Sequence, residues 1–254
     1  MAGFATGEQR WIDNLSNLRN TIRQEVIARQ LADHVADGAT VLDVGCGQGT
    51  QALRLAARGC RVTGVEPSAD LRNRATGDAE RAGVELELIA GGIDDLDPLL
   101  GGRTFDAVCA HGLLMYLPDR SAAVASLARR LEPGGRLSVT VRNGHALAMR
   151  PGLRGDWAAA LAAFDRPDYV NEIGVSARAD RIEDVESDLR RAGLQMAACY
   201  GVRVLNDAIP VEQQPPPDDE LGLLLDAEDR AGRLDPYRWM ASQLHVVATR
   251  PEGT

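Results

Sequence analysis

The sequence of 254 residues predicts an α/β fold with a mostly parallel sheet. Two observations predict it: short apolar runs typical of strands alternate with helical segments, and the first such run ends in a glycine-rich loop. Strands that alternate with helices form parallel sheets with right-handed crossovers. Ligands of such sheets bind beyond the carboxyl ends of the strands. We therefore expect the functional residues at those ends.

The predicted elements start with a helix over about 11–36, whose apolar residues recur at helical spacing. The predicted strands are 40–44, 61–66, 85–91, 105–111, 136–143, 194–205 and 243–250. Two segments, about 144–180 and 206–241, interrupt the alternation, and the second contains the proline-rich stretch QQPPPDDE. We expect a single domain over 1–254 in which both segments are substrate-covering insertions, the second with one or two helices.

Composition excludes several classes of protein. The net charge is −9 and every basic residue is arginine, so the broad basic footprint of a nucleic-acid binder is missing. No window approaches 18 apolar residues and the start of the chain is unlike a secretory signal, so we expect no membrane span. Four scattered cysteines suit a reducing, cytoplasmic setting, and no Cys/His spacing indicates a metal.

The glycine-rich loop lies in VLDVGCGQGT, residues 41–50. Gly45, Gly47 and Gly49 permit positive φ and a close approach of the backbone to a ligand. Their G-x-G-x-G spacing is one residue shorter than the dinucleotide fingerprint G-x-G-x-x-G, and Asp43 precedes them. An acid suits the ammonium of an amino-acid ligand. The loop therefore favours a methyl donor over a dinucleotide.

Further candidates follow the next strands. Glu66, before Pro67, ends the second strand, where an acid can accept both hydroxyls of a ribose. After the third strand, Asp94 or Asp95 is expected either to bind an adenine amino group or to cap the next segment. His111 ends the fourth strand, and we expect it to be either a general base or a wall of the donor pocket.

Four stretches together resemble the class I S-adenosylmethionine-dependent methyltransferases: VLDVGCGQGT, VEPSADL, FDAVCAHGLLMYLPD and LEPGGRLSV. The resemblance implies a Rossmann-like fold with helices on both faces of a seven-stranded sheet and an antiparallel last strand. It also implies S-adenosylmethionine as cofactor, lying over the glycine loop, and S-adenosylhomocysteine as product. Cys46, Pro67 and Ile93 join the donor-binding candidates on this basis.

A narrower resemblance is to the bacterial tRNA 5-carboxymethoxyuridine methyltransferase family, carried by TIRQEVIARQL, CAHGLLMYLPD, NGHALAM, YGVRVLND and DPYRWMASQLHVVATRP. That family esterifies a carboxylate on a tRNA wobble uridine. The resemblance implies that Arg23 contacts the donor. It further implies that donor-binding positions fall at Gly45, Gly47, Glu66, Asp94 and His111. The lysine-rich segment of the family has no counterpart in residues 144–180.

The acceptor candidates are Tyr116, Arg142, Asn143, Arg150 and Arg154. Arginine forks match carboxylate or phosphate, although arginines on a surface are often merely solvated. We expect in-line methyl transfer to an oxygen, carboxylate or hydroxyl, of an anionic small molecule. Only a hydroxyl would need His111 as a base, because a carboxylate is ionised at pH 7.

Two alternatives remain open. One is carboxyl methylation of a modified tRNA wobble base, and the other is a non-catalytic nucleotide-binding protein or a dinucleotide oxidoreductase. The sequence does not indicate an oligomeric state.

Overall fold

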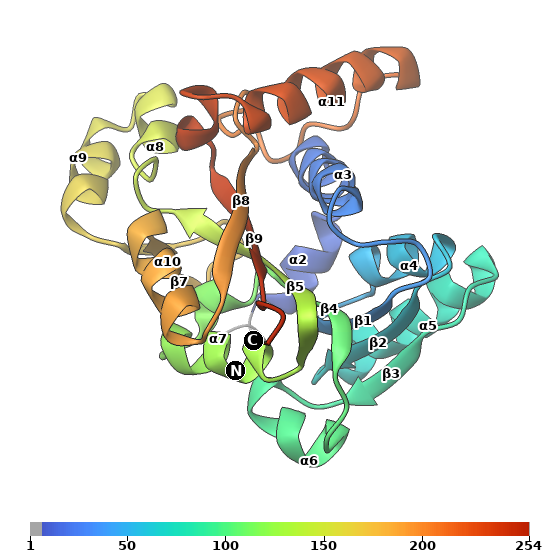
Figure 1. Ribbon diagram of the computed structural model, residues 1–254. Coiled ribbons are helices and arrows are strands. Elements are labelled where there is room, and N and C mark those ends of the chain that lie inside the picture. The colour runs from blue at the N-terminus through green and yellow to red at the C-terminus, as the bar shows by residue number, and fades with distance from the viewer. Residues whose placement is uncertain (1–6, 254) are drawn as a thin grey trace.

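The computed structural model describes residues 7–253 and shows a twisted sheet with helices on both faces (Figure 1). Within this part of the chain, seven strands run in the order β3-β2-β1-β4-β5-β9-β8. β9 is antiparallel to both of its neighbours, and the other pairs in the row are parallel. The predicted Rossmann-like sheet with an antiparallel last strand is confirmed.

The strands of this row are β1 (Thr40–Val44), β2 (Arg61–Glu66), β3 (Glu87–Ala90), β4 (Phe105–His111), β5 (Leu131–Asn143), β8 (Gln195–Val202) and β9 (Gln243–Thr249). Two differ clearly from the prediction. β5 begins at Leu131 because that residue already pairs with Phe105 before a register shift. β8 ends at Val202 because Arg203 has a φ of 58°, which breaks the extended backbone.

Helices on the two faces of the sheet fix the strand ends. The connecting elements are α4 (Thr50–Ala57), α5 (Ala69–Ala82), η1 (Ile93–Asp95), α6 (Leu96–Leu100), η2 (Leu114–Tyr116), α7 (Arg120–Ala128) and α10 (Ile182–Arg191). On one face, Leu55 of α4 is buried with Val41 and Val62. On the other, Leu127 of α7 and Leu189 of α10 join the largest apolar core.

The N-terminal region holds two helices rather than the single helix predicted over 11–36. These are α2 (Glu8–Asp13) and α3 (Leu18–Ala32). Asn17 separates them, because its backbone is extended and its side chain accepts a hydrogen bond from the N–H of Asn20. This is an N-cap, which starts a new helix. α3 then packs Ile22 and Val26 against Val202 and Leu225.

The second insertion has the helical structure predicted for it, whereas the first has regular structure that the sequence did not reveal. The first contains α8 (Met149–Leu153), α9 (Trp157–Asp165), β6 (Asp168–Val170) and β7 (Ser176–Asp180). β6 and β7 form a hairpin, and β7 pairs parallel with Arg142 and Asn143 at the end of β5. These strands are short and polar, so no alternation marks them. β7 also contacts η2, the segment that follows β4.

The second insertion contains α11 (Asp218–Arg233) and η3 (Tyr237–Met240). α11 begins after the proline-rich stretch, with Pro217 as its N-cap, and it packs on α3 and β8. No helix among the described residues is long and apolar enough to span a membrane.

Candidate active site

A cavity of about 540 Å³ lies at the carboxyl ends of β1, β2 and β4, a size typical of small-molecule sites. Its walls fall into two parts. The glycine half is formed by Asn20, Arg23, Gly45, Gly47, Glu66, Pro67, Ser68, His111, Gly112 and Tyr116. The arginine half is formed by Arg19, Arg142, Arg150, Tyr169, Glu172 and Arg203. The cavity therefore joins the predicted strand ends to the insertions.

The glycine loop is held in shape by its neighbours on β2. Gly45 donates its N–H to the carbonyl of Val65 at 2.8 Å, and Gly47 donates to Oε2 of Glu66 at 3.0 Å. Both glycines have positive φ, 69° and 58°, which other residues rarely adopt. The loop thus exposes backbone rather than side chains to the cavity.

Glu66 lies at the junction between this loop and α5. It is buried, and its carboxylate also accepts from the N–H of Ser68 at 2.9 Å. Burial raises the pKa of Glu66, although the two N–H bonds act in the opposite direction. The hydroxyl of Ser68 donates to Glu8 of α2 at 2.9 Å, so the N-terminal helix closes this end of the cavity.

Arg23 is a partly buried cation without a counter-ion among the described residues. It extends from α3 into the glycine half, and burial lowers its pKa. Within residues 7–253 it makes no ion pair, and its Nε has no hydrogen-bond partner. A partly buried guanidinium of this kind is costly unless an anion pairs with it. The neutral phenol of Tyr116 lies nearby; burial raises the pKa of Tyr116 to about 12, and Tyr116 accepts from Asn171 at 2.9 Å.

Several predicted donor residues lie outside the cavity walls: Asp43, Cys46, Gly49, Ile93 and Asp94. Asp43 is buried next to Glu66, and burial raises its pKa to about 7. Cys46 packs over Gly64, where a Cβ atom would come within 2.8 Å of its sulfur. Asp94 is exposed, whereas Asp95 caps the turn by accepting from Gly92 at 2.8 Å.

His111 faces the cavity at the end of β4. Its Nε2 lies 2.8 Å from Oγ of Ser138 on β5. Burial, and then the positive charge of Arg23, lowers the pKa of His111 to about 3. The imidazole is therefore neutral at ordinary pH and a poor proton acceptor.

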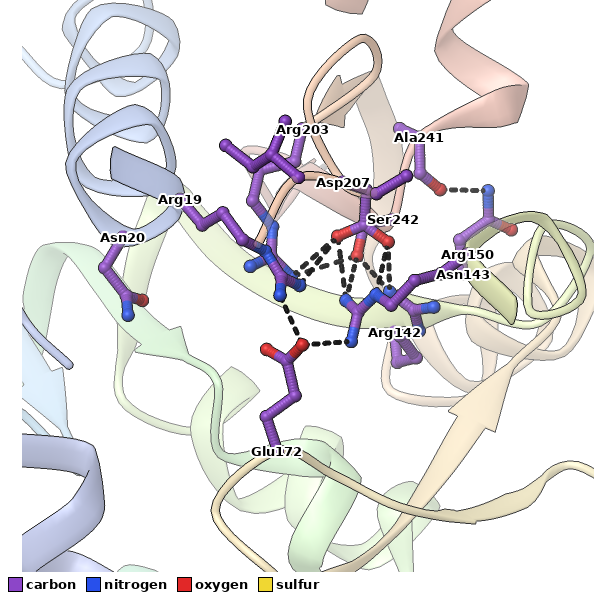
Figure 2. A network of polar contacts seen from close by, with 12 residues as sticks. Arg19, Asn20, Arg142, Asn143, Arg150, Glu172, Arg203, Asp207, Ala241 and Ser242 are labelled. Carbon is purple, nitrogen blue, oxygen red and sulfur yellow. Dashed lines mark hydrogen bonds and ion pairs between the residues drawn. The ribbon is translucent and has the colours of Figure 1, made fainter. Parts of the chain in front are cut away.

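The arginine half is built around one carboxylate (Figure 2). Arg150 of α8 binds both oxygens of Asp207 at 2.8 Å. Three more arginines approach the same carboxylate: Arg19 and Arg203 at 3.3 Å, and Arg142 at 3.5 Å. These four, which we call the arginine cluster, come from α3, β5, α8 and the residue after β8.

The cluster carries more positive charge than its protein partners neutralise. Its second carboxylate is Glu172, in the β6–β7 turn, which binds Arg19 and lies 3.5 Å from Arg150. Arg154 also lies 3.6 Å from Glu172, so five guanidiniums face two carboxylates, a surplus of three positive charges. The Nε atoms of Arg19, Arg142 and Arg203 are buried without partners among the described residues. Burial lowers the pKa of Arg203 to about 9, whereas the surrounding arginines hold the pKa of Asp207 below its usual range.

Some of the predicted acceptor residues line the cavity, and the others lie outside its walls. Arg142, Arg150 and Tyr116 line the cavity. Asn143 does not: its amide donates to the carbonyls of Trp239 and Ala241, both at 2.9 Å. Arg154 also lies outside the cavity walls: it donates to the carbonyls of Ala208 and Ile209, and its Nη1 lies 3.6 Å from Glu172.

Sequence reasoning missed Arg19, Arg203, Asp207 and Glu172. One signal was available, since Arg19 lies one helical turn before Arg23 on the same face of α3. No local pattern marks the other three.

Comparison with known proteins agrees with this geometry. Residues 42–139 match a family model described as a methyltransferase domain. The tRNA 5-carboxymethoxyuridine methyltransferase of Escherichia coli (strain K12) is 29% identical over 245 residues, which cover 93% of this chain and 89% of that protein. The ubiquinone biosynthesis O-methyltransferase of Xanthomonas axonopodis pv. citri (strain 306) is 30% identical over 209 residues, covering 78% of this chain and 81% of that protein.

Solved structures share the fold. Magnesium protoporphyrin IX methyltransferase from Synechocystis PCC 6803, with bound S-adenosylhomocysteine, has a TM-score of 0.64 and 17% identity, covering 96% of this chain and 94% of that chain. The [4+2]-cyclase SpnF has a TM-score of 0.62 and 22% identity, covering 90% of this chain and 82% of that chain. Because a cyclase has this fold too, likeness of fold alone does not define the chemistry.

Proposed function

Because the chain belongs to the class I S-adenosylmethionine-dependent methyltransferases, we propose that it methylates a carboxylate oxygen of an anionic small molecule. Family membership argues against the dinucleotide oxidoreductase that the glycine loop left open. The cofactor is S-adenosylmethionine, which supplies an electrophilic methyl group on a sulfonium. The arginine half of the cavity is the observation that supports this proposal.

The residues of the glycine half fit this cofactor. The unpaired guanidinium of Arg23 suits the carboxylate of its amino-acid part, because a partly buried cation favours an anion. Glu66 suits the ribose hydroxyls, since a carboxylate accepts from two donors. Gly45 and Gly47 leave room for close contact with backbone.

The arginine cluster supports an anionic acceptor. Its surplus charge lies in the same cavity as the glycine half, so an acceptor bound there would also face the donor. A carboxylate or phosphate would pair with the buried Nε groups that now have no partner. Tyr169 packs its ring 5.7 Å from the guanidinium of Arg142 and would limit the acceptor to a compact shape.

The state of His111 favours a carboxylate over a hydroxyl as the methyl acceptor. A hydroxyl must lose a proton during transfer, and the low pKa of His111 makes it a weak base. A carboxylate is already ionised and needs none. The chain then contributes mainly by alignment of donor and acceptor, which can lower a barrier by roughly 7–11 kcal/mol.

Carboxyl methylation of a tRNA wobble nucleoside is the second candidate. It rests on the Escherichia coli relative, which carries that name and aligns with 93% of this chain. That reaction also methylates a carboxylate, which the arginine cluster would bind in the same way. The net charge of −9 favours the small molecule.

A transfer assay with methyl-labelled S-adenosylmethionine tests the proposal. Purified enzyme is offered bulk tRNA and a small-molecule extract that has been separated by anion exchange. We expect label to be transferred when the retained fraction, which holds the anionic small molecules, is offered as the substrate. Transfer to tRNA alone would favour the second candidate. Transfer only when the unretained fraction of neutral molecules is offered would contradict both.

A further inference from the structure

A buried chain of hydrogen bonds connects His111 to α3 through the middle of the sheet. Oγ of Ser138 lies 2.8 Å from Nε2 of His111 and 2.7 Å from Nε2 of His245 on β9. Nδ1 of His245 lies 2.8 Å from Oε1 of Gln30 on α3. Ser138, His245 and Gln30 are each 0% exposed, so water does not compete for these bonds.

Gln30, at the far end of this series of hydrogen bonds, sets the donor and acceptor in each of them. The amide nitrogen of Gln30 donates to the carbonyl of Gly201 at 3.1 Å, which turns its oxygen toward His245. That oxygen only accepts, so Nδ1 of His245 must carry its proton. Nε2 of a neutral His245 is then an acceptor for the hydroxyl of Ser138. The oxygen of Ser138 is left to accept from Nε2–H of His111.

Only one tautomer of His111 satisfies this order. Nε2 carries the proton and Nδ1 keeps a lone pair. Nδ1 is buried and has no partner among the described residues. Buried polar atoms are rarely left unsatisfied, so this lone pair is an open acceptor on a residue that lines the cavity.

We infer that Ser138, His245 and Gln30 are positioning residues, which hold His111 as the Nε2–H tautomer and present its Nδ1 as a hydrogen-bond acceptor. A ligand group that meets Nδ1 is therefore an O–H or N–H donor. We call the chain from Gln30 through His245 and Ser138 to His111 the relay. The same face of α3 carries Arg19, Arg23 and Gln30, so this one helix contributes to the arginine cluster, the glycine half and the relay. The inference does not depend on which acceptor the enzyme uses.

Nitrogen-15 NMR of the full chain, labelled at its four histidines, tests the inference without any activity assay. Long-range couplings show which ring nitrogen carries the proton. We expect His111 protonated at Nε2 and His245 protonated at Nδ1, both at pH 7. A His111 protonated at Nδ1, or a mixture of tautomers in either ring, would overturn the inference.

Substitutions in the relay show which residue fixes the tautomer. Ser138→Ala should convert His111 from one tautomer to a mixture. Cys109→Ala is the matched control, because Cys109 is the β4 partner of Ser138 and equally buried, and it should leave one tautomer. Gln30→Leu should release the tautomer of His245, and Gln30→Glu should keep it because a carboxylate still accepts. A single His111 tautomer in a folded Ser138→Ala protein would contradict the role of Ser138. If that variant does not fold, the wild-type spectrum and the Gln30 pair decide.

Discussion

The two halves of the cavity are built in different ways. The glycine half uses the ends of neighbouring strands, and much of its surface is backbone held by short-range bonds such as that from Gly47 to Glu66. The arginine half uses charged side chains from four separate elements, which meet on Asp207 in a loop. The first half suits a cofactor shared by a family, and the second suits an acceptor specific to this protein.

Removing Arg150 should have the largest effect, and only on the arginine half. Arg150→Met leaves Asp207 without its bidentate partner and the acceptor without a buried cation. Loss of one member of a buried charge pair costs about 2–5 kcal/mol, so kcat/KM for the acceptor should fall about 30-fold or more. Calorimetric affinity for S-adenosylhomocysteine should stay within about twofold of wild type.

Arg166→Met is the matched control, because Arg166 lies on the same insertion, is exposed and does not line the cavity. It should change acceptor kinetics little. Equal losses in the two variants would show that the insertion matters as a whole and that the arginine cluster has no special role.

Removing Glu66 should affect only the glycine half. Glu66→Ala deletes the carboxylate expected to bind the ribose. Hydrogen bonds to a charged group contribute about 1.5–3 kcal/mol, so the affinity for S-adenosylhomocysteine should fall about 10-fold to 100-fold. Asp94→Asn, at an exposed position outside the cavity, should bind normally. Wild-type affinity in Glu66→Ala would reject its proposed role, and a weakened Asp94→Asn would restore Asp94 to the donor site.

Arg23 should show a smaller effect on the same ligand. Arg23→Met keeps the length of the side chain but removes its charge, and the affinity for S-adenosylhomocysteine should fall about tenfold, or about 1.4 kcal/mol. Arg29→Met removes an exposed arginine from the same helix and should be neutral. If both variants bind the ligand equally well, Arg23 does not pair with its carboxylate.

The smallest expected effect is that of pH on His111. Its pKa of about 3 means that the ring is neutral at every pH above about 4. Burial lowers this pKa most, and the charge of Arg23 on α3 adds to the effect; Ser138 on β5 and His245 on β9 also face the ring. With both substrates saturating, kcat should therefore not rise through pH 6.5. A rise with a midpoint there would mean that His111 is an ordinary histidine acting as a base.

The same contrast explains what the sequence could predict. Gly45, Gly47, Glu66 and His111 follow strand ends, and local patterns placed all four in the cavity. Asp94 stays a prediction: it is exposed outside the cavity walls, and an acid after a strand can also serve as a turn residue.

The arginine half depends on tertiary structure that no local pattern encodes. Arg203 enters the cluster only because the backbone turns to positive φ after β8, and Asp207 only because its loop folds back over β5. Arg142 and Arg150 were predicted from residue type. Arg154 and Asn143 had equal support from the sequence, but the structure uses them to hold backbone.

The chemistry of the transferred methyl group tests the central claim most directly. Methyl-labelled product is treated with mild alkali, which hydrolyses methyl esters and leaves methyl ethers and methylamines intact. Transfer to a carboxylate predicts that the label is released as methanol, and that Arg150→Met loses this product while still binding S-adenosylhomocysteine. Label that survives alkali would contradict a carboxylate acceptor and assign the methyl group to a hydroxyl or a nitrogen.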